Sequence, residues 1–310
     1  MKKFGLIVLF LLFVVLLVVV LRPSTIRSKT EVKKEYAQPD SKFVNWNGTE
    51  IHYTEDGTGF PVLMIHGFGS SNWDFYLLDS LLRDKYRIIR IDMPGFGLSD
   101  YPDNEKAYQD IFSTYNNYFD FLLNTLHLDS FYVIGNSLGG MFAWNLANRH
   151  PQQVKKLVLL NSAGYEMDKV IKEANADAFR KSYVRWFLQK GIPEFLIRDG
   201  MDRICFNRPE IYSFQVDRMW KYWNREGNLQ HIMRMVNYEH YIPSAEIKKI
   251  QCPTLILWGK QDQIVSVRYA DSFHHDIKNS QLIIYDSCGH VPMIERPLDV
   301  ERDVLKFFEE

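Results

Sequence analysis

The chain has 310 residues, of which 46% are hydrophobic and 24% are charged. This length fits one α/β domain, and this composition excludes a disordered, collagenous or low-complexity protein. The 37 Lys and Arg residues balance the 38 Asp and Glu residues. Five of the cations lie in the first thirty residues, so the rest of the chain is net acidic, which disfavours binding to a nucleic-acid backbone. Three cysteines, Cys205, Cys252 and Cys288, are too few and too far apart for a disulfide framework or a structural zinc site.

An uninterrupted apolar stretch runs from Phe4 to Leu21, eighteen residues without a charge or an amide. A helix of this length spans about 27 Å, close to the hydrocarbon thickness of a bilayer. We therefore expect an uncleaved N-terminal membrane helix. The alternative is a cleaved signal peptide, which would leave a secreted or periplasmic protein, but the apolar run is longer than usual and no A-x-A-like cleavage site follows it. Cations flank both ends of the stretch, so the positive-inside rule does not fix its orientation.

Residues 22–40 are polar and charged, and Pro23 and Pro39 bound them. They show no periodic apolar face, so we expect a short tether. The membrane anchor and tether together would occupy residues 1–40, and the globular domain would start near Ser41 and continue to residue 310.

The globular part alternates short apolar runs with longer helix-like stretches. Asn47-Gly48 favours a tight turn between two strands, Lys42–Trp46 and Glu50–Tyr53. Six further runs are apolar throughout, as expected of strands buried on both faces: Val62–Ile65, Arg87–Ile91, Phe131–Ile134, Val154–Leu160, Thr254–Trp258 and Gln281–Tyr285. Helices are expected between them, for example over Trp73–Leu82, Ile111–Leu126, Leu138–His150 and Val267–Ile277. This alternation predicts a mostly parallel sheet covered by helices on both faces.

The alternation stops between about Gly164 and Ala245, where the sequence is helix-like and rich in aromatic residues. Such a stretch is either a set of additional core helices or an inserted helical cap whose aromatic side chains line a pocket. Its position after the sixth strand favours a cap, expected over about residues 165–245.

The strongest chemical signal is Gly135-Asn136-Ser137-Leu138-Gly139-Gly140. It follows an expected strand directly and precedes an expected helix, which is the setting that a G-x-S-x-G motif requires. On such a sharp turn the serine hydroxyl is exposed, and the flanking glycines avoid clashes with the neighbouring strand and helix. Ser137 is therefore the candidate nucleophile, and the alternative is an ordinary Gly-rich connection.

A serine hydroxyl needs a base to remove its proton, and the base needs an orienting partner. His290 lies in a Gly-flanked loop directly after the last expected strand, and Asp262 follows the strand before it. The chain order Ser, Asp, His is the one used by the fold that carries this motif. Asp286 is nearer to His290 in sequence, but we assign it to stabilising the loop. No acid follows the sixth strand, where Asn161 stands.

The oxyanion of a tetrahedral intermediate needs hydrogen-bond donors. We expect one from the Leu138 backbone N–H, at the start of the helix after the nucleophile. The second is expected from Phe68 N–H, in the loop His66-Gly67-Phe68-Gly69, whose glycines let the backbone approach a substrate. His66 is expected to order this loop and to take no part in catalysis.

Five motifs in chain order resemble the α/β-hydrolase family: His66-Gly67-Phe68-Gly69, Asp92-Met93-Pro94-Gly95-Phe96-Gly97-Leu98-Ser99, Gly135-Asn136-Ser137-Leu138-Gly139-Gly140, Trp258-Gly259-Lys260-Gln261-Asp262 and Gly289-His290. The resemblance covers about residues 43–310. It implies an α/β-hydrolase fold with a mostly parallel eight-stranded sheet and an inserted helical cap. It implies Ser137 as nucleophile, His290 as base, Asp262 as acid, and Phe68 and Leu138 as oxyanion donors. Asp92 would be a structural loop residue.

The elbow also separates branches of this family. Haloalkane dehalogenases and epoxide hydrolases of similar pattern carry aspartate where Ser137 stands, and proline iminopeptidases usually show Gly-Gly-Ser-Trp-Gly there. The Gly-Asn-Ser elbow and the Pro-Gly-Phe-Gly loop resemble the meta-cleavage-product hydrolases, which cleave a C–C bond beside a ketone and are usually soluble. A membrane anchor, shared with the monoacylglycerol-lipase-like branch, favours a lipid-derived ester.

We therefore expect a membrane-anchored serine hydrolase that cleaves a carboxylic ester, possessing no cofactor and no metal, with a small-molecule ester or lipid as substrate. The acyl group would pass through an acyl-enzyme on Ser137. A C–C bond hydrolase and a non-catalytic ligand-binding protein on the same scaffold are the alternatives.

Overall fold

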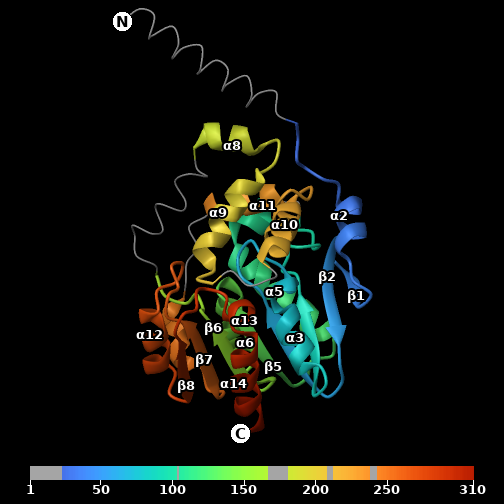
Figure 1. Cartoon of the computed structure of the whole chain (residues 1–310). Helices are drawn as coiled ribbons and strands as arrows, with labels where there is room; N and C mark the ends of the chain where they lie inside the picture. Colours follow the sequence, from blue (N-terminus) through green and yellow to red (C-terminus); the bar gives the residue numbers. More distant parts are fainter. Residues whose placement is uncertain (1–22, 103–104, 167–180, 208–211, 238–242) are drawn as a thin grey trace, which may run out of the picture.

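The computed structural model of the chain describes residues 23–102, 105–166, 181–207, 212–237 and 243–310. Its centre is an eight-stranded sheet in the order β1-β2-β4-β3-β5-β6-β7-β8 (Figure 1). β2 pairs antiparallel with β1 and with β4, and the other neighbouring pairs are parallel. The strands are β1 (Ser41–Trp46), β2 (Thr49–Asp56), β3 (Phe60–Ile65), β4 (Tyr86–Ile91), β5 (Phe131–Asn136), β6 (Val154–Leu160), β7 (Thr254–Gly259) and β8 (Ser280–Tyr285). The mostly parallel sheet predicted from the sequence is therefore confirmed.

The two edges of the sheet differ from its buried centre. At one edge Asn47 and Gly48 have φ angles of +49° and +87°, which makes the tight turn predicted between β1 and β2. At the other edge β8 has a neighbour on one side only, and its Ile284 is 42% exposed. The expectation that this strand is buried on both faces was wrong, because an apolar run does not reveal an edge position.

Helices cover both faces of the sheet, as predicted. Side chains of α5, α6 and α12 share one apolar cluster with the strands, and those of α3, α13 and α14 share a second cluster on the other face. The helices outside the cap region are α2 (Lys29–Tyr36), α3 (Tyr76–Leu82), α4 (Glu105–Gln109), α5 (Ile111–Thr125), α6 (Leu138–Arg149), α12 (Arg268–Asp276), α13 (Pro292–Glu295) and α14 (Pro297–Glu309). A 3-10 turn, η1 (Asn72–Phe75), replaces the first turn of the helix expected before Leu82.

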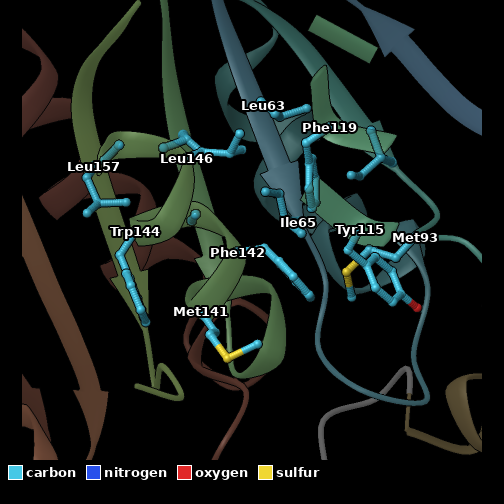
Figure 2. Packing of buried hydrophobic residues seen from close by; sticks show 14 of the residues in the cluster. Leu63, Ile65, Met93, Tyr115, Phe119, Met141, Phe142, Trp144, Leu146 and Leu157 are labelled. Carbon is cyan, nitrogen blue, oxygen red and sulfur yellow. The ribbon is translucent and has the colours of Figure 1, made fainter. Parts of the chain in front are cut away.

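The packing between the sheet and α6 holds the start of that helix in place. Leu63 and Ile65 of β3 pack in one apolar cluster with Phe142 of α6 and Phe119 of α5 (Figure 2). All four are at most 1% exposed. The Phe142 ring also stacks on Tyr115, with the ring centroids 4.9 Å apart. Such close packing leaves α6 little freedom to shift relative to β3.

Between β6 and β7 the chain forms helices that lie over one end of the sheet (Figure 1). These are α8 (Ser182–Leu188), α9 (Glu194–Ile204), α10 (Tyr212–Trp223) and α11 (Asn228–Asn237), and a 3-10 helix, η2 (Ser244–Lys249), leads back to the sheet. The helical character expected for this stretch is confirmed where the structure describes it. Parts of the expected cap, residues 167–180, 208–211 and 238–242, lie outside the described residues.

Residues 24–27, called the strap below, lie against these helices. Thr25 N–H donates to the carbonyl oxygen of Lys190 over 2.7 Å, and Arg27 N–H donates to that of Asn224 over 2.8 Å. The Thr25 hydroxyl also donates to the Asn224 side-chain oxygen over 2.9 Å. The strap therefore joins the stretch before β1 to the loop between α8 and α9 and to the residue that follows α10.

Helix α2 follows the strap and lies within residues 22–40, where the sequence predicts a tether. Ser28 caps it through a reciprocal pair of hydrogen bonds with Glu31. Val32 and Tyr36, one turn apart, are buried to 0% and 6% exposure. The expectation of a stretch with no packed face does not hold, because two apolar side chains four residues apart are too few to show a period.

Within the described residues, no helix has both the length and the apolar composition that crossing a bilayer requires. The apolar stretch from Phe4 to Leu21 lies outside those residues.

Replacing Val32 by Ala tests the packing of α2. The substitution leaves a cavity beneath the helix, so we expect it to lower the free energy of unfolding by about 1–3 kcal/mol. Thermal or urea unfolding of the full chain in detergent measures the change. Lys34→Ala, at an exposed position of the same helix, is the matched control and should change stability by less than about 0.5 kcal/mol. Equal stability of the two variants would contradict a packed α2.

Candidate active site

Ser137 stands at the turn between β5 and α6 in a backbone conformation that few residues adopt. Its φ and ψ angles are +53° and −118°. The turn is forced because α6 passes very close to the sheet: a Cβ atom on Gly139 would lie 2.1 Å from the carbonyl oxygen of Ile65. A Cβ on Gly135 would lie 2.4 Å from the carbonyl oxygen of Gly139. The glycines thus let strand and helix meet at a sharp elbow that presents the Ser137 side chain.

His290 and Asp262 lie together, as their positions after β8 and β7 predict. The His290 Nδ1 atom is 2.7 Å from Asp262 Oδ2. Asp262 Oδ1 accepts hydrogen bonds from the backbone N–H groups of Ile264 (2.7 Å) and Val265 (3.0 Å). Burial by itself raises the pKa of Asp262, but the adjacent His290 and these donors outweigh burial and hold the pKa below its usual value. An ionised Asp262 favours the tautomer that carries a proton on Nδ1 and leaves Nε2 free as a base.

Asn161, at the end of β6, binds the same carboxylate. Its Nδ2 donates to Asp262 Oδ2 over 2.6 Å and to the carbonyl oxygen of Gly289 over 3.2 Å. Its Oδ1 accepts from Gly259 N–H over 3.2 Å. The Asn161 side chain therefore hydrogen-bonds to Asp262, to the end of β7 and to the loop that carries His290. The sequence marked this position only as lacking an acid, and nothing in the pattern around it indicates the amide's role.

The elbow and the histidine loop are held side by side. Asn136, next to Ser137, donates from Nδ2 to the carbonyl oxygens of Leu160 (3.0 Å) and His290 (3.1 Å). Among the described residues, no hydrogen bond joins Ser137 Oγ to the His290 ring in this conformation. Such contacts are often long in unliganded enzymes and tighten when substrate is bound.

The two expected oxyanion donors lie next to this elbow. Leu138 is the first residue of α6, and a Cβ atom on Gly67 would come within 3.2 Å of the Ser137 Cβ, so the loop that carries Phe68 runs beside the nucleophile. In the described part of the chain neither Leu138 N–H nor Phe68 N–H donates to another protein group. Both donors are free to bind an oxyanion.

Asp92 and His66 order the loops beneath these donors. Asp92 is fully buried and accepts hydrogen bonds from Asn72 N–H (2.7 Å) and Leu98 N–H (2.8 Å), and it contacts the His52 ring at 2.7 Å. Burial raises the pKa of Asp92, but His52 and the backbone donors outweigh burial and lower it. The His66 Nε2 atom accepts from Met93 N–H over 3.0 Å, so its proton lies on Nδ1, which is 2.7 Å from the Gly67 carbonyl oxygen. His66 therefore orders the loop, as expected, and is not placed as a base.

A further carboxyl group near the site was missed by the sequence analysis. Asp74 of η1 accepts a hydrogen bond from the Ser70 hydroxyl. Burial raises the pKa of Asp74 to about 7, and the charge of His290 opposes the shift, so the two groups lie within electrostatic range. Nothing in the sequence around Asp74 separates it from an ordinary helix-start acid. No group of three His, Cys, Asp or Glu side chains in the described ranges is placed to hold a metal ion.

Comparison with known proteins agrees with this fold. The family model described as the alpha/beta hydrolase fold matches residues 61–297, most of the chain. The chain therefore belongs to the α/β-hydrolase superfamily.

Three relatives show the range of the family. The 2-hydroxy-6-oxo-6-(2'-aminophenyl)hexa-2,4-dienoic acid hydrolase of Metapseudomonas resinovorans is 31% identical over 276 residues, which cover 86% of this chain and 90% of that protein. The crystal structure of a membrane phospholipase A, described as a bacterial virulence factor, is 25% identical with a TM-score of 0.73 and covers 100% of this chain and 98% of its own. A thermophilic esterase from Thermogutta terrifontis shares the fold, with 23% identity, a TM-score of 0.72 and coverage of 88% of this chain and 98% of its own.

Replacing Asn161 by Asp tests how Asp262 is kept ionised. A second carboxylate beside Asp262 disfavours ionisation of both, so the pKa of the pair should rise. In the proposed chemistry the acidic limb of kcat/KM reports protonation of the base that faces Asp262, and a second carboxylate there favours the protonated base, so we expect the limb to move up by about one pH unit or more. The pH profile of p-nitrophenyl butyrate hydrolysis measures this shift. Asn124→Asp, at an exposed position of α5, is the control and should leave the limb unchanged. A lower rate with an unmoved limb would contradict this role for Asn161.

Proposed function

We propose that the protein is a serine hydrolase that cleaves a carboxylic ester through an acyl-enzyme on Ser137. The observation that carries this proposal is the 2.7 Å contact between His290 and the buried Asp262, beside a serine at a strained elbow. Two backbone N–H groups with no protein partner, on Phe68 and Leu138, complete the set of groups that acyl transfer requires.

The chemistry follows from these positions. His290 Nε2 takes the proton of Ser137 as the hydroxyl oxygen attacks the ester carbonyl. Phe68 N–H and Leu138 N–H bind the oxyanion that forms, and each such donor is worth about 3–4 kcal/mol in the transition state. His290 then gives its proton to the departing alcohol. A water molecule, deprotonated by the same ring, hydrolyses the acyl-enzyme and restores Ser137.

A lipid-derived ester is the substrate that we favour. The membrane phospholipase A similar to this chain supports this choice, as does the apolar stretch from Phe4 to Leu21, which we propose is an uncleaved single-pass anchor. Within the described residues, six of nine exposed large hydrophobic side chains lie between Tyr183 and Phe214. An apolar surface of this kind suits contact with an amphiphilic substrate or a membrane.

The domain organisation that we propose has an anchor-bearing segment over residues 1–40 and a hydrolase domain over residues 41–310. In this proposal the insertion over about residues 165–245 is the cap that covers the site. The packing of the strap and α2 against the cap means that the first segment is partly built into the fold.

Hydrolysis of a C–C bond beside a ketone is the second candidate. It is favoured by the 31% identity to the dienoic acid hydrolase from Metapseudomonas resinovorans. The two candidates share the serine, the base and the acid, and they differ in the bond that is broken.

Ester hydrolysis is tested with p-nitrophenyl esters from acetate to palmitate and the full chain in detergent. We expect turnover that falls by more than about 10⁴-fold in Ser137→Ala and His290→Ala, and by about 10⁴-fold in Asp262→Asn, which cannot hold the required histidine tautomer. Ser162→Ala, a change at a buried serine that the mechanism does not use, is the control. Undiminished turnover by Ser137→Ala would overturn the mechanism. Activity on a vinylogous diketone acid but on no ester would favour the C–C hydrolase.

Membrane attachment is tested by fractionating cells that express the full chain. We expect the protein to stay in the membrane pellet after a carbonate wash, because about 27 Å of apolar helix holds it there. A variant lacking residues 4–21 should move to the soluble fraction, whereas Ser137→Ala should not. An N-terminus that begins after Leu21 in the purified protein would instead identify a signal peptide.

A further inference from the structure

A small cavity lies between the loop after β3 and the cap helices α9 and α10. It begins at Gly69, directly after the expected oxyanion donor Phe68, so it adjoins the candidate active site. The side chains that matter for its chemistry are Trp73, Asp74, Met201, Gln215, Arg218 and Met219.

Arg218 is a buried cation without an acidic partner. Its side chain is 6% exposed, and in the described part of the chain no carboxylate lies within ion-pair distance of it. Its Nη1 donates to the Tyr222 hydroxyl over 3.1 Å, and its Nε has no hydrogen-bond partner. The guanidinium stacks on the Trp73 ring at 3.7 Å and on Tyr36 at 4.5 Å. Stacking offsets part of the cost of burial, but it leaves donors in the plane of the guanidinium unused.

The other buried arginines are paired. Arg90 lies 2.9 Å from the Asp79 carboxylate, and Arg225 lies 2.8 Å from that of Asp100. This contrast is expected, because burying a charge is costly unless it meets an opposite charge. Arg218 departs from the rule, and it does so on the wall of a cavity.

Two more groups on the same cavity lack partners. Gln215 is 5% exposed, and neither its amide oxygen nor its amide nitrogen makes a hydrogen bond. The Trp73 indole N–H has none either. Of the twelve buried side-chain polar atoms without a partner in the described residues, four belong to Trp73, Gln215 and Arg218, and this concentration around one cavity points to a bound group. The unused groups are three kinds of N–H donor and a single amide oxygen, a set that suits an anion.

We propose that Arg218, Gln215 and Trp73 form a subsite for an anionic group of the substrate, a phosphate or a carboxylate borne near the ester that is cleaved. This inference rests on the proposed ester hydrolysis and names the class of ester. A guanidinium binds both anions through paired N–H···O bonds, and the neutral amide and indole donors complete the contact. Met201 and Met219 give the same cavity apolar walls. Burial raises the pKa of Asp74 to about 7, which reduces the cost of placing an anion beside its carboxyl group.

The test compares three esters that share the same hydrocarbon chain and differ in charge. They are a neutral monoacylglycerol, a lysophosphatidylglycerol and a half-ester that carries a free carboxylate. For Arg218→Met we expect kcat/KM to fall about 10- to 100-fold for an anionic ester and less than about threefold for the monoacylglycerol. Gln215→Leu should show the same preference to a smaller extent. The anionic ester whose kcat/KM falls more in Arg218→Met identifies the bound group as a phosphate or a carboxylate. Arg198→Met, at an exposed arginine of α9, is the matched control and should affect no substrate.

An equal fall for charged and neutral esters in Arg218→Met would overturn the proposal and assign Arg218 a structural role in the cap. No fall for any ester would also overturn it. Should Arg218→Met fail to fold, Arg218→Lys keeps the charge, and the proposal then requires it to retain the preference for the anionic ester at a reduced kcat/KM.

A binding measurement separates this proposal from the proposed ester hydrolysis. Ser137→Ala protein should gain thermal stability from glycerol 3-phosphate or from succinate, and adding Arg218→Met should abolish the gain. Stabilisation that depends on Arg218, together with wild-type protein that cleaves no ester, would preserve the subsite and reject the ester hydrolase. Ester turnover without any such stabilisation or anion preference would reject the subsite alone.

Discussion

The close approach of α6 to the central strands is the constraint on which the site depends. At the elbow the helix is so near β3 and β5 that a methyl group on Gly135 or Gly139 would collide with backbone. The chain can enter the helix only through the strained conformation of Ser137. That strain, on the order of 1–3 kcal/mol, persists because the packing of Phe142 and its neighbours against the sheet and α5 fixes the helix. Core packing thus places the hydroxyl and the N–H of Leu138 together.

The same core carries two buried carboxylates that stay ionised for the same physical reason. Asp92 and Asp262 each pay for burial with a histidine and backbone N–H donors, which hold both pKa values low. Asp92 ties the loop after β3 to the loop after β4, and Asp262 ties the end of β7 to the loop after β8. The Asp92 carboxylate therefore orders the loop that carries the expected oxyanion donor Phe68, and the Asp262 carboxylate orders the loop that carries His290. Loss of either charge would release backbone donors as well as a side chain.

Sequence reasoning was strong where one local rule decides the structure. Buried parallel strands give unbroken apolar runs, and Gly135 and Gly139 around Ser137 mark an elbow, so the sheet and the positions of Ser137, Asp262 and His290 could be predicted. Where the deciding contact is distant, the sequence was silent. Asn161 binds Asp262, which lies 101 residues further along the chain. In sequence Arg218 looks like any other helix arginine, and only the structure shows that its Nε lacks a hydrogen-bond partner.

The helices between β6 and β7 are attached to the loop after β4, the loop that Asp92 orders. Arg225 donates to the carbonyl oxygens of Leu98 (3.0 Å) and Ser99 (3.3 Å), and Asn228 donates to that of Gly97 over 2.9 Å. Nearby His231 packs so tightly that a methyl group on Gly95 would overlap its ring, and burial lowers the pKa of His231 to about 3, so this contact stays neutral at ordinary pH.

The strap bonds to Asn224, directly after α10, and to Lys190, between α8 and α9. Helix α2 contacts α10 directly, because the Tyr36 hydroxyl donates to Asp217 over 2.9 Å and the Lys221 ammonium lies 2.6 Å from the Glu35 carboxylate. The segment that follows the apolar N-terminal stretch is therefore bound to the helix that carries Gln215 and Arg218. The position of the proposed anion subsite is in this way coupled to how the N-terminal segment is held.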